Sequence, residues 1–330
     1  MWRSDFDEKA QDLFYMSPGK RIYLDPANGS DGSPGTMNSP KKTPSGAYSL
    51  LRDDKNDALM VIPGPSPITV TGSLEIAKNG VSIVGLAPNQ HHARTAAIDK
   101  AACAIRCVTS GVDSIFNITG NGVRLYNLDT MNTYTHNDNR CDIRVAGRAS
   151  YFEGCGFRGG NGANQLNHND GGVAVIMATG TAGAGNGARF KDCHFGNSSN
   201  DARSLGASWV LYEGTDVVAG FFNEYIDCIF DTRIETVSAI VGGIILAARF
   251  AADRYMLFRN CFFYNFWTNH VDKANYVIYD LAGNTHDIVL MNSAMAGFDA
   301  WANTGTYVFT NMADAGTMGG KVSAVAPTTG

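Results

Sequence analysis

The sequence is poor in charged residues and lacks the segments that mark several classes of protein. Only 17% of its 330 residues are Asp, Glu, Lys or Arg, and the formal net charge is −5. Because no cluster of Lys and Arg is present that could neutralise phosphate groups, we expect no nucleic-acid partner. Residues 1–14 contain no apolar core of the kind found in signal peptides, and the longest apolar run, residues 237–250, is too short to span a bilayer. We therefore expect neither a signal peptide of the usual kind nor a membrane partner.

The chain also lacks the cysteine pattern of a disulfide scaffold and the short motifs of several enzyme classes. Its seven cysteines are an odd number and are widely spaced, which is typical of reduced thiols in a chain folded in a cytoplasm. No GxSxG segment, phosphate-binding lysine motif or EF-hand spacing is present. With 44% hydrophobic residues and 37 glycines, the chain can bury a sizeable core in one large domain or two ordinary ones.

A short pattern recurs along the chain. Clear copies are YFEGCGF (151–157), RFKDCHF (189–195), YIDCIF (225–230) and LFRNCFF (257–263), and looser copies are SIVGLAP (82–88), RLYNLDT (124–130) and VLMNSAM (289–295). The copies align on the residue before the cysteine or its equivalent. That residue is always Gly, Asn or Asp, the types that adopt a left-handed backbone conformation at least cost. These anchor residues are Gly85, Asn127, Gly154, Asp192, Asp227, Asn260 and Asn292.

The apolar positions around each anchor change phase at the anchor. A straight strand places positions −2, 0 and +2 on one face, but here the apolar positions are −2, +1 and +3. A corner at the anchor explains this change, because two strands joined by a left-handed residue can both face one interior. Further strand-like runs lie between the anchors and predict a third strand in each turn, for example at 114–118, 171–178, 208–214, 242–248 and 276–283.

A constant corner with irregular spacing favours a coil of short strands over a propeller or a helical repeat. The corner motif resembles the right-handed single-stranded parallel β-helix of the pectate-lyase-like superfamily, and 74–89 and 114–132 look like early turns of that fold. Residues 21–51 resemble the entry to such folds in bacteriophage proteins, where a first strand leads into a polar loop and a short capping helix. The resemblance implies an all-β solenoid over residues 19–310, with an extended tail over 311–330.

Residues 1–18 are expected to form a helical arm or cap. Ser4 and Asp7 make a capping box at the start of an amphipathic helix over 4–16, and Pro18 with Gly19 ends it. Its apolar face comprises Phe6, Ala10, Leu13 and Phe14. Two interpretations stay open: the helix folds back on the first turn as a local cap, or it docks on another subunit or a larger assembly.

The copy of the pattern around Cys193, RFKDCHF (189–195), could indicate a metal site or a nucleophile, but its recurrence along the chain favours packing. Cys193 is expected to face the interior in a column with Cys155, Cys228 and Cys261, where a free thiol behaves as a small apolar group. His194 then points outward and shares no site with the sulfur. We expect no metal or cofactor.

Catalytic candidates are weak. The resemblance implies, for pectate lyases, clustered aspartates with an arginine base and, for polygalacturonases, aspartates with a Gly-His-Gly segment, and the chain shows neither set. Asp192 and Asp227 lie on consecutive turns and could approach each other, but their corner role already explains them. Other acidic neighbours are expected to be solvated loop charges; they are the set Asp227, Asp231 and Glu235 and the set Glu213, Asp216 and Glu224. The sequence thus predicts no catalytic residue.

Aromatic residues could line a sugar-binding groove or lie in the core or an interface; they are Trp209, Trp267, Trp301, Tyr264 and Phe266.

Two functions fit these features. The first is a non-enzymatic structural protein of a bacteriophage virion, made in the host cytoplasm. It would be a capsid decoration, head spike or short fibre component that other virion proteins hold through the N-terminal arm. The resemblance implies a homo-oligomer, with a trimer as the expected state and the apolar segment 237–246 as one contact. The alternative is a tailspike-like protein that binds or degrades bacterial surface glycans as a hydrolase or lyase.

Overall fold

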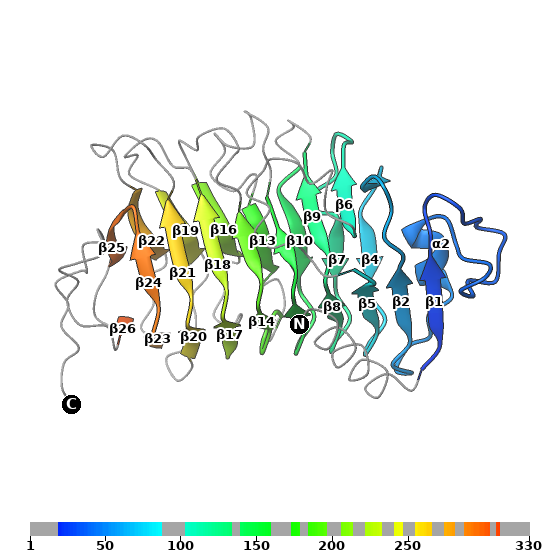
Figure 1. Ribbon diagram of the computed structural model, residues 1–330. Helices are drawn as coiled ribbons and strands as arrows, with labels where there is room; N and C mark the ends of the chain where they lie inside the picture. The colour runs from blue at the N-terminus through cyan, green and yellow to red at the C-terminus, as the bar shows by residue number, and fades with distance from the viewer. Residues whose placement is uncertain are drawn as a thin grey trace, which may run out of the picture.

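The computed structural model of the chain is a right-handed parallel β-helix (Figure 1). It describes residues 19–87, 103–133, 139–159, 173–178, 184–196, 206–213, 222–232, 241–246, 255–265, 274–280, 287–303 and 308–310. Each turn of the coil contributes one strand to each of three parallel sheets, which we call sheets A, B and C in chain order. The predicted fold is therefore confirmed.

Sheet A contains ten strands within the described residues. They are β1 (Arg21–Leu24), β2 (Ala58–Val61), β5 (Ser82–Gly85), β8 (Arg124–Tyr126), β11 (Tyr151–Glu153), β14 (Arg189–Lys191), β17 (Asn223–Ile226), β20 (Tyr255–Arg259), β23 (Asp287–Met291) and β26 (Val308–Thr310). At the usual separation of parallel strands the ten span about 43 Å along the axis of the coil.

Sheets B and C contain eight strands each in the same part of the chain. Sheet B comprises β3 (Ile68–Val70), β6 (Ala104–Cys107), β9 (Asp129–Asn132), β12 (Gly156–Phe157), β15 (His194–Gly196), β18 (Ile229–Thr232), β21 (Phe262–Asn265) and β24 (Ala294–Ala296). Sheet C comprises β4 (Leu74–Ile76), β7 (Phe116–Ile118), β10 (Cys141–Val145), β13 (Val173–Ala178), β16 (Gly206–Glu213), β19 (Val241–Leu246), β22 (Ala274–Asp280) and β25 (Phe298–Ala302). The runs predicted as third strands thus fall in sheet C.

The corner from sheet A to sheet B is the predicted left-handed hinge. Six of the seven anchors have φ between 49° and 64°, and each connects two strands in only two residues; they are Asn127, Gly154, Asp192, Asp227, Asn260 and Asn292. The hinges stack in a column because the strands before them pair in register, Glu153 with Lys191 and Ile226 with Arg259. The N–H groups of the first five hinges each donate to a carbonyl of the next turn, as Asp192 does to Ile226 at 3.0 Å.

The seventh anchor was predicted wrongly. Gly85 ends β5 in an extended conformation, is absent from the residues with positive φ, and is followed by a long connection to β6. A Cβ at Gly85 would overlap the carbonyl oxygen of Asn127 on the next turn. Glycine is needed there for a close approach of two backbones, and the following Leu86 packs on the outer face of sheet A instead of the interior.

The interior consists of columns of similar side chains. Adjacent aromatic rings stack nearly parallel with centroids 4.5 Å apart for Phe152 and Phe190 and 4.7 Å apart for Tyr225 and Phe258 in sheet A. A second stack in sheet B places Phe230 4.7 Å from Phe263. Offset aromatic pairs at these separations contribute about 0.5–1.5 kcal/mol beyond their buried area. The columns therefore tie each turn to the next.

Cys193 faces the interior, as predicted. It is 2% exposed and lies with Cys155, Cys228 and Cys261 at equivalent positions of successive turns. All seven cysteines are free and buried. Burial raises the pKa of the Cys193 and Cys261 thiols, so they stay protonated at neutral pH and pack as apolar groups.

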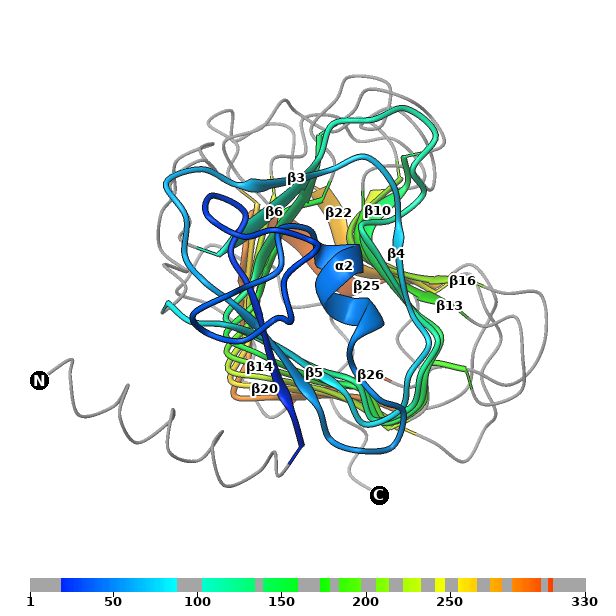
Figure 2. The same ribbon diagram turned by 90° about the vertical axis from the view of Figure 1, so that its right-hand side faces the viewer.

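The entry to the coil is closed by the short helix α2 (Pro44–Ser49), which lies over the interior when the molecule is viewed from the β1 end (Figure 2). Thr43 caps the helix by accepting a hydrogen bond from the Gly46 N–H, and Ala47 is buried against the core. At the other end, the Lys78 ammonium donates to the carbonyls of Tyr48, Ser49 and Leu51. The predicted strand, polar loop and capping helix over 21–51 are confirmed.

Two of the aromatic candidates belong to the core. Trp209 is fully buried and Trp301 is 4% exposed, whereas Trp267 and Phe266 lie outside the described residues. β16 carries a bulge between Ala207 and Val210, which places Trp209 opposite Gly243 of β19. The apolar segment 237–246, expected to form one contact between subunits, ends in strand β19 of sheet C, which agrees with the strand predicted over 242–248.

Both predicted terminal elements, residues 1–18 and 311–330, lie outside the described residues. The domain boundaries therefore stay predictions, although the strands of the described residues fall between Arg21 and Thr310. Among the residues that the structure places, no helix is long and apolar enough to cross a membrane.

Candidate functional site

The carboxylates weighed from the sequence do not form one site. Asp192 and Asp227 are hinge residues on consecutive turns, and Asp227 accepts a hydrogen bond from Asn260 Nδ2 at 2.9 Å. Glu213 lies in sheet C and Glu224 in sheet A. Their predicted companions Asp216 and Glu235 lie outside the described residues.

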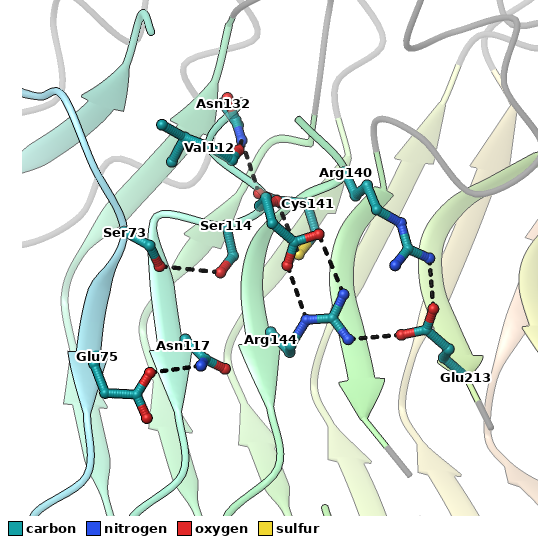
Figure 3. A network of polar contacts seen from close by, with 11 residues as sticks. Ser73, Glu75, Val112, Ser114, Asn117, Asn132, Arg140, Cys141, Arg144 and Glu213 are labelled. Carbon is teal, nitrogen blue, oxygen red and sulfur yellow. Dashed lines mark hydrogen bonds and ion pairs between the residues drawn. The ribbon is translucent and has the colours of Figure 1, made fainter. Parts of the chain in front are cut away.

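The outer face of sheet C carries a network of four charged side chains, which we call the sheet C network: Asp113, Arg140, Arg144 and Glu213 (Figure 3). Arg144 on β10 donates to Asp113 Oδ2 through Nε at 2.9 Å and to Asp113 Oδ1 through Nη2 at 3.2 Å. Its Nη1 donates to Glu213 Oε2 at 2.6 Å, reaching past β13 to β16. Arg140 donates to the other oxygen of Glu213 at 2.7 Å.

The electrostatics of this network favour binding over proton transfer. Burial opposes the charge on Glu213, but hydrogen bonds from Arg140 and Arg144 outweigh it and lower the pKa of Glu213. Arg144 is held charged in the same way, because the bonds to Asp113 and Glu213 overcome its burial and raise its pKa. A carboxylate with a lowered pKa is a poor general acid near neutral pH. The partly exposed groups could still bind hydroxyl groups of a ligand.

A separate group of three polar residues lies nearby on the same face. Glu75 on β4 accepts hydrogen bonds from Asn117 Nδ2 and Thr119 Oγ1, each at 2.6 Å (Figure 3 shows Asn117). Because both oxygens of Glu75 have protein partners, it is held as an acceptor on the surface. Together with the sheet C network it places polar side chains on the outer face of sheet C, next to a small apolar cluster of Cys141, Val173, Ile176 and Leu211.

Sequence reasoning missed a second cluster, on the outer face of sheet B, which we call the sheet B cluster: Asp129, Arg158, His194 and Asp231. Arg158 donates through Nε and Nη2 to the two oxygens of Asp129, both at 3.0 Å. Its Nη1 lies 3.5 Å from His194 Nδ1, and His194 Nε2 lies 2.8 Å from Asp231 Oδ1. All four residues are less than 9% exposed. Asp129 outweighs the opposing effect of burial and raises the pKa of Arg158.

The geometry of the sheet B cluster indicates a structural part for His194. The Arg158 guanidinium, which can only donate, lies against Nδ1, and the Asp231 carboxylate lies against Nε2. Both ring nitrogens are therefore engaged by protein groups, and neither is directed at a ligand. Gly156 makes room for the cluster, because a Cβ there would overlap Asp129 Oδ1.

The repeat itself contained the signal that would have revealed this cluster. Asp129 and His194 stand two residues after their hinges, and Arg158 and Asp231 stand four residues after theirs. These are outward positions of sheet B in two adjacent columns: Asp129 and His194 pair with Gly156, and Asp231 pairs with Gly196, so the charged residues of neighbouring turns lie on diagonals. Charges of opposite sign at diagonal outward positions of neighbouring turns predict an ion pair where one side chain is as long as arginine.

A third polar group closes the corner between sheets B and C. Asp142 on β10 is fully buried and accepts hydrogen bonds from the N–H groups of Asn132 at 2.7 Å and Gly159 at 2.9 Å, and from Thr130 Oγ1 at 3.3 Å. Burial outweighs these bonds and raises the pKa of Asp142 to about 7. The Asn132 amide donates to the carbonyls of Val112 and Cys141 (Figure 3). The Asp142 carboxyl group thus accepts hydrogen bonds from two backbone N–H groups that have no neighbouring strand to donate to at the point where the chain changes direction.

No metal site is evident in the described residues, where no group of three or more His, Cys, Asp or Glu side chains is placed to hold an ion. Asp25 and Asp31, in the polar entry loop, instead accept hydrogen bonds from nearby backbone N–H groups. These are Ala27 and Asn28 for Asp25, and Lys42 and Thr43 for Asp31. Such contacts stabilise turns.

Comparisons with solved structures agree with the fold. A pectin methylesterase from Aspergillus niger aligns over 94% of this chain and 88% of its own, with 13% identity and a TM-score of 0.55. Pectate lyase Pel9A aligns over 90% of this chain and 79% of its own, with 12% identity and a TM-score of 0.52. The ORF18 protein of Geobacillus virus E2 aligns over 93% of this chain and 62% of its own, with 12% identity, but its TM-score of 0.45 is too low to support a conclusion.

At identities this low the likeness shows a shared fold and nothing about activity. No family model and no curated protein matches the sequence. The chain thus has the parallel β-helix architecture also found in pectin methylesterases and pectate lyases.

Proposed function

We propose that this chain is a non-enzymatic structural protein of a bacteriophage virion, held in the particle by its N-terminal arm. The observation that carries the proposal is the interior of the coil. Columns of stacked side chains continue through successive turns, and they make the chain a stiff rod. A rod of about 43 Å suits a short projection from a particle surface.

The charged groups also support a structural role. In the described part of the chain, three clustered carboxylates are paired with arginines, Asp113 and Glu213 with Arg144 and Asp129 with Arg158, and Asp231 is bonded to His194. Cleavage of a glycosidic bond requires a carboxylic acid with a raised pKa beside a second carboxylate. Asp142 has the raised pKa, but it is fully buried and accepts hydrogen bonds from the backbone.

The entry segment supports the viral assignment, because it folds as the strand, polar loop and capping helix that its resemblance to bacteriophage proteins implied. We expect a homotrimer with parallel axes, which sedimentation analysis of the purified chain would detect.

Mass spectrometry of purified particles of the encoding phage tests this proposal. The chain should be present in a fixed ratio to the capsid protein, and deletion of residues 1–18 should remove it from the particles. The matched variant Arg144→Ala, which changes only the face of sheet C, should be incorporated normally. Absence of the chain from particles, or full incorporation of the deleted chain, would contradict the proposal.

A second candidate function is binding or cleavage of bacterial surface glycans, and the polar face of sheet C favours it. Glu213 and Asp113 are 34% and 41% exposed while Arg140 and Arg144 hold them in place, and such a surface could bind sugar hydroxyls. Incubation of the purified protein with host capsule or lipopolysaccharide, with release of reducing ends as the measurement, tests it. Activity that disappears in Glu213→Gln but persists in the hinge variant Asp192→Asn would replace the structural proposal with an enzymatic one.

A further inference from the structure

The outer face of sheet A carries an apolar cluster that the core does not explain. We call it the sheet A patch: Ala58, Met60, Val84 and Tyr126, bordered by Tyr23 and Tyr151. These residues alternate with the interior column, since Leu59, Ile83 and Leu125 point inward from the same strands. The patch is thus a separate cluster on the outside of the β-helix.

The patch is covered although it faces outward. Ala58, Met60, Val84 and Tyr126 are only 2–7% exposed. A sheet buries its second face when another layer of structure packs on it. None of the described helices or strands provides that layer, because α2 lies over the end of the coil and sheets B and C line the other sides (Figure 2).

We propose that the sheet A patch is the docking site for residues 4–16 of the same chain, bound as an amphipathic helix. The described chain begins at Gly19, two residues before β1, and β1 contributes Tyr23 at the edge of the patch. The segment therefore starts beside its site and needs no long linker.

The dimensions of the two partners agree. The patch crosses five neighbouring strands, from β1 to β11, which is about 19 Å along the coil. A helix over the thirteen residues from Ser4 to Met16 is about 20 Å long. Its apolar face, comprising Phe6, Ala10, Leu13 and Phe14, would lie along the patch and bury both apolar surfaces.

The charges beside the patch also agree with this partner. Arg21 and Arg124 occupy equivalent positions on the outer face of sheet A, one column away from Tyr23, Met60, Val84 and Tyr126. The helix carries Asp5, Asp7, Glu8 and Asp12 against the single Lys9. Glu153 follows Tyr126 in the patch's own column, but Lys191 pairs with it at 2.9 Å. An acidic helix on an apolar strip beside Arg21 and Arg124 is therefore stabilised by both effects. The inference concerns the free chain and does not depend on the proposed function.

Hydrogen-exchange mass spectrometry of the full chain tests the inference. We expect the amides of residues 4–16 to exchange at least about tenfold more slowly than in the free peptide 1–18. Leu13→Asp on the helix and Val84→Asp on the patch should each abolish this protection while the strands of sheets B and C stay protected. The matched controls are Gln11→Asp, outside the apolar face of the helix, and Leu257→Asp, on the outer face of sheet A beyond the patch; both should keep it.

Three outcomes would overturn the inference. Exchange of residues 4–16 at the rate of the free peptide would show that the segment is not docked. Protection that survives Val84→Asp in a folded chain would place the helix elsewhere. Protection that disappears on dilution, together with a fall in mass by light scattering, would assign the patch to the arm of a second copy.

Discussion

The two corners on either side of sheet B differ in how much they vary from turn to turn. From β8 to β24, every connection from sheet A to sheet B is a two-residue hinge with one left-handed residue. The connections from sheet B to sheet C vary in length, from the single residue Gly297 between β24 and β25 to residues 158–172 between β12 and β13. The hinge fixes the register of the coil, so the other corner can change length without disturbing the stack. We therefore expect substitutions at equivalent hinge residues to change the free energy of unfolding by similar amounts. We expect the corner between sheets B and C, which we call the variable corner, to contain the polar contacts whose loss destabilises the protein most.

Substitutions in the sheet B cluster, which lies next to the variable corner, should have the largest effect on the free energy of unfolding. Asp129→Ala leaves Arg158 charged and buried without its bidentate partner, and the free energy of unfolding should fall by about 3–5 kcal/mol. Urea denaturation measures it. The double variant Asp129→Ala with Arg158→Met should recover most of the loss, and a double variant as unstable as the single one would show that the ion pair is not the cause.

The variable corner should also make stability depend on pH. Folded Asp142 keeps its proton up to a pH of about 7, whereas an unfolded aspartate loses it near pH 4. The folded state binds more protons between these values, so this group makes the free energy of unfolding decrease as pH rises from about 4 to 7, by at most about 4 kcal/mol.

The comparison variant is Asp142→Asn, which cannot ionise. Its free energy of unfolding, measured by denaturation across the same pH range, should lack this decrease even if the protein is less stable overall. Parallel pH profiles for the two proteins would contradict the raised pKa.

Packing across the variable corner should have an intermediate effect. Trp209 on β16 contacts Phe230 and Phe263 of sheet B, and a Cβ on Gly243 would overlap its ring. Gly243→Ala should lower the free energy of unfolding by about 1–3 kcal/mol because the ring must move. Gly72→Ala is the control, since nothing lies within 4 Å of its Cβ. Thermal denaturation would show equal melting temperatures for both variants if Trp209 had free space.

The hinge should show the smallest effect. Asn260→Ala places a side chain without local hydrogen bonds at φ 55° and should lower the free energy of unfolding by about 1–2 kcal/mol. Asn260→Gly keeps the conformation accessible and should cost less, although it loses the bond to Asp227. Equal losses for the two variants, measured by urea denaturation, would mean that the side chain matters more than the backbone.

Sequence reasoning found the hinges because their constraint is local. A left-handed residue restricts its own identity, and the change of phase at Asp192 or Asn260 can be seen within seven residues. It failed at Gly85, where the constraint is the carbonyl of Asn127 on the next turn. It also missed Arg158 and Asp129, which are 29 residues apart in sequence and meet only once the register of the turns is known. The sequence did not decide whether Trp209 lies in the core or in a groove, because the bulge that turns it inward has no sequence signature.

The strands of this rod run across its long axis, so the hydrogen bonds between turns point along that axis. Tension applied to the two ends would load those bonds in series and peel the turns apart one after another. A sideways load would instead bend many strands at once, with the stacked rings resisting shear. The molecule should therefore withstand a sideways load better than a pull along its axis.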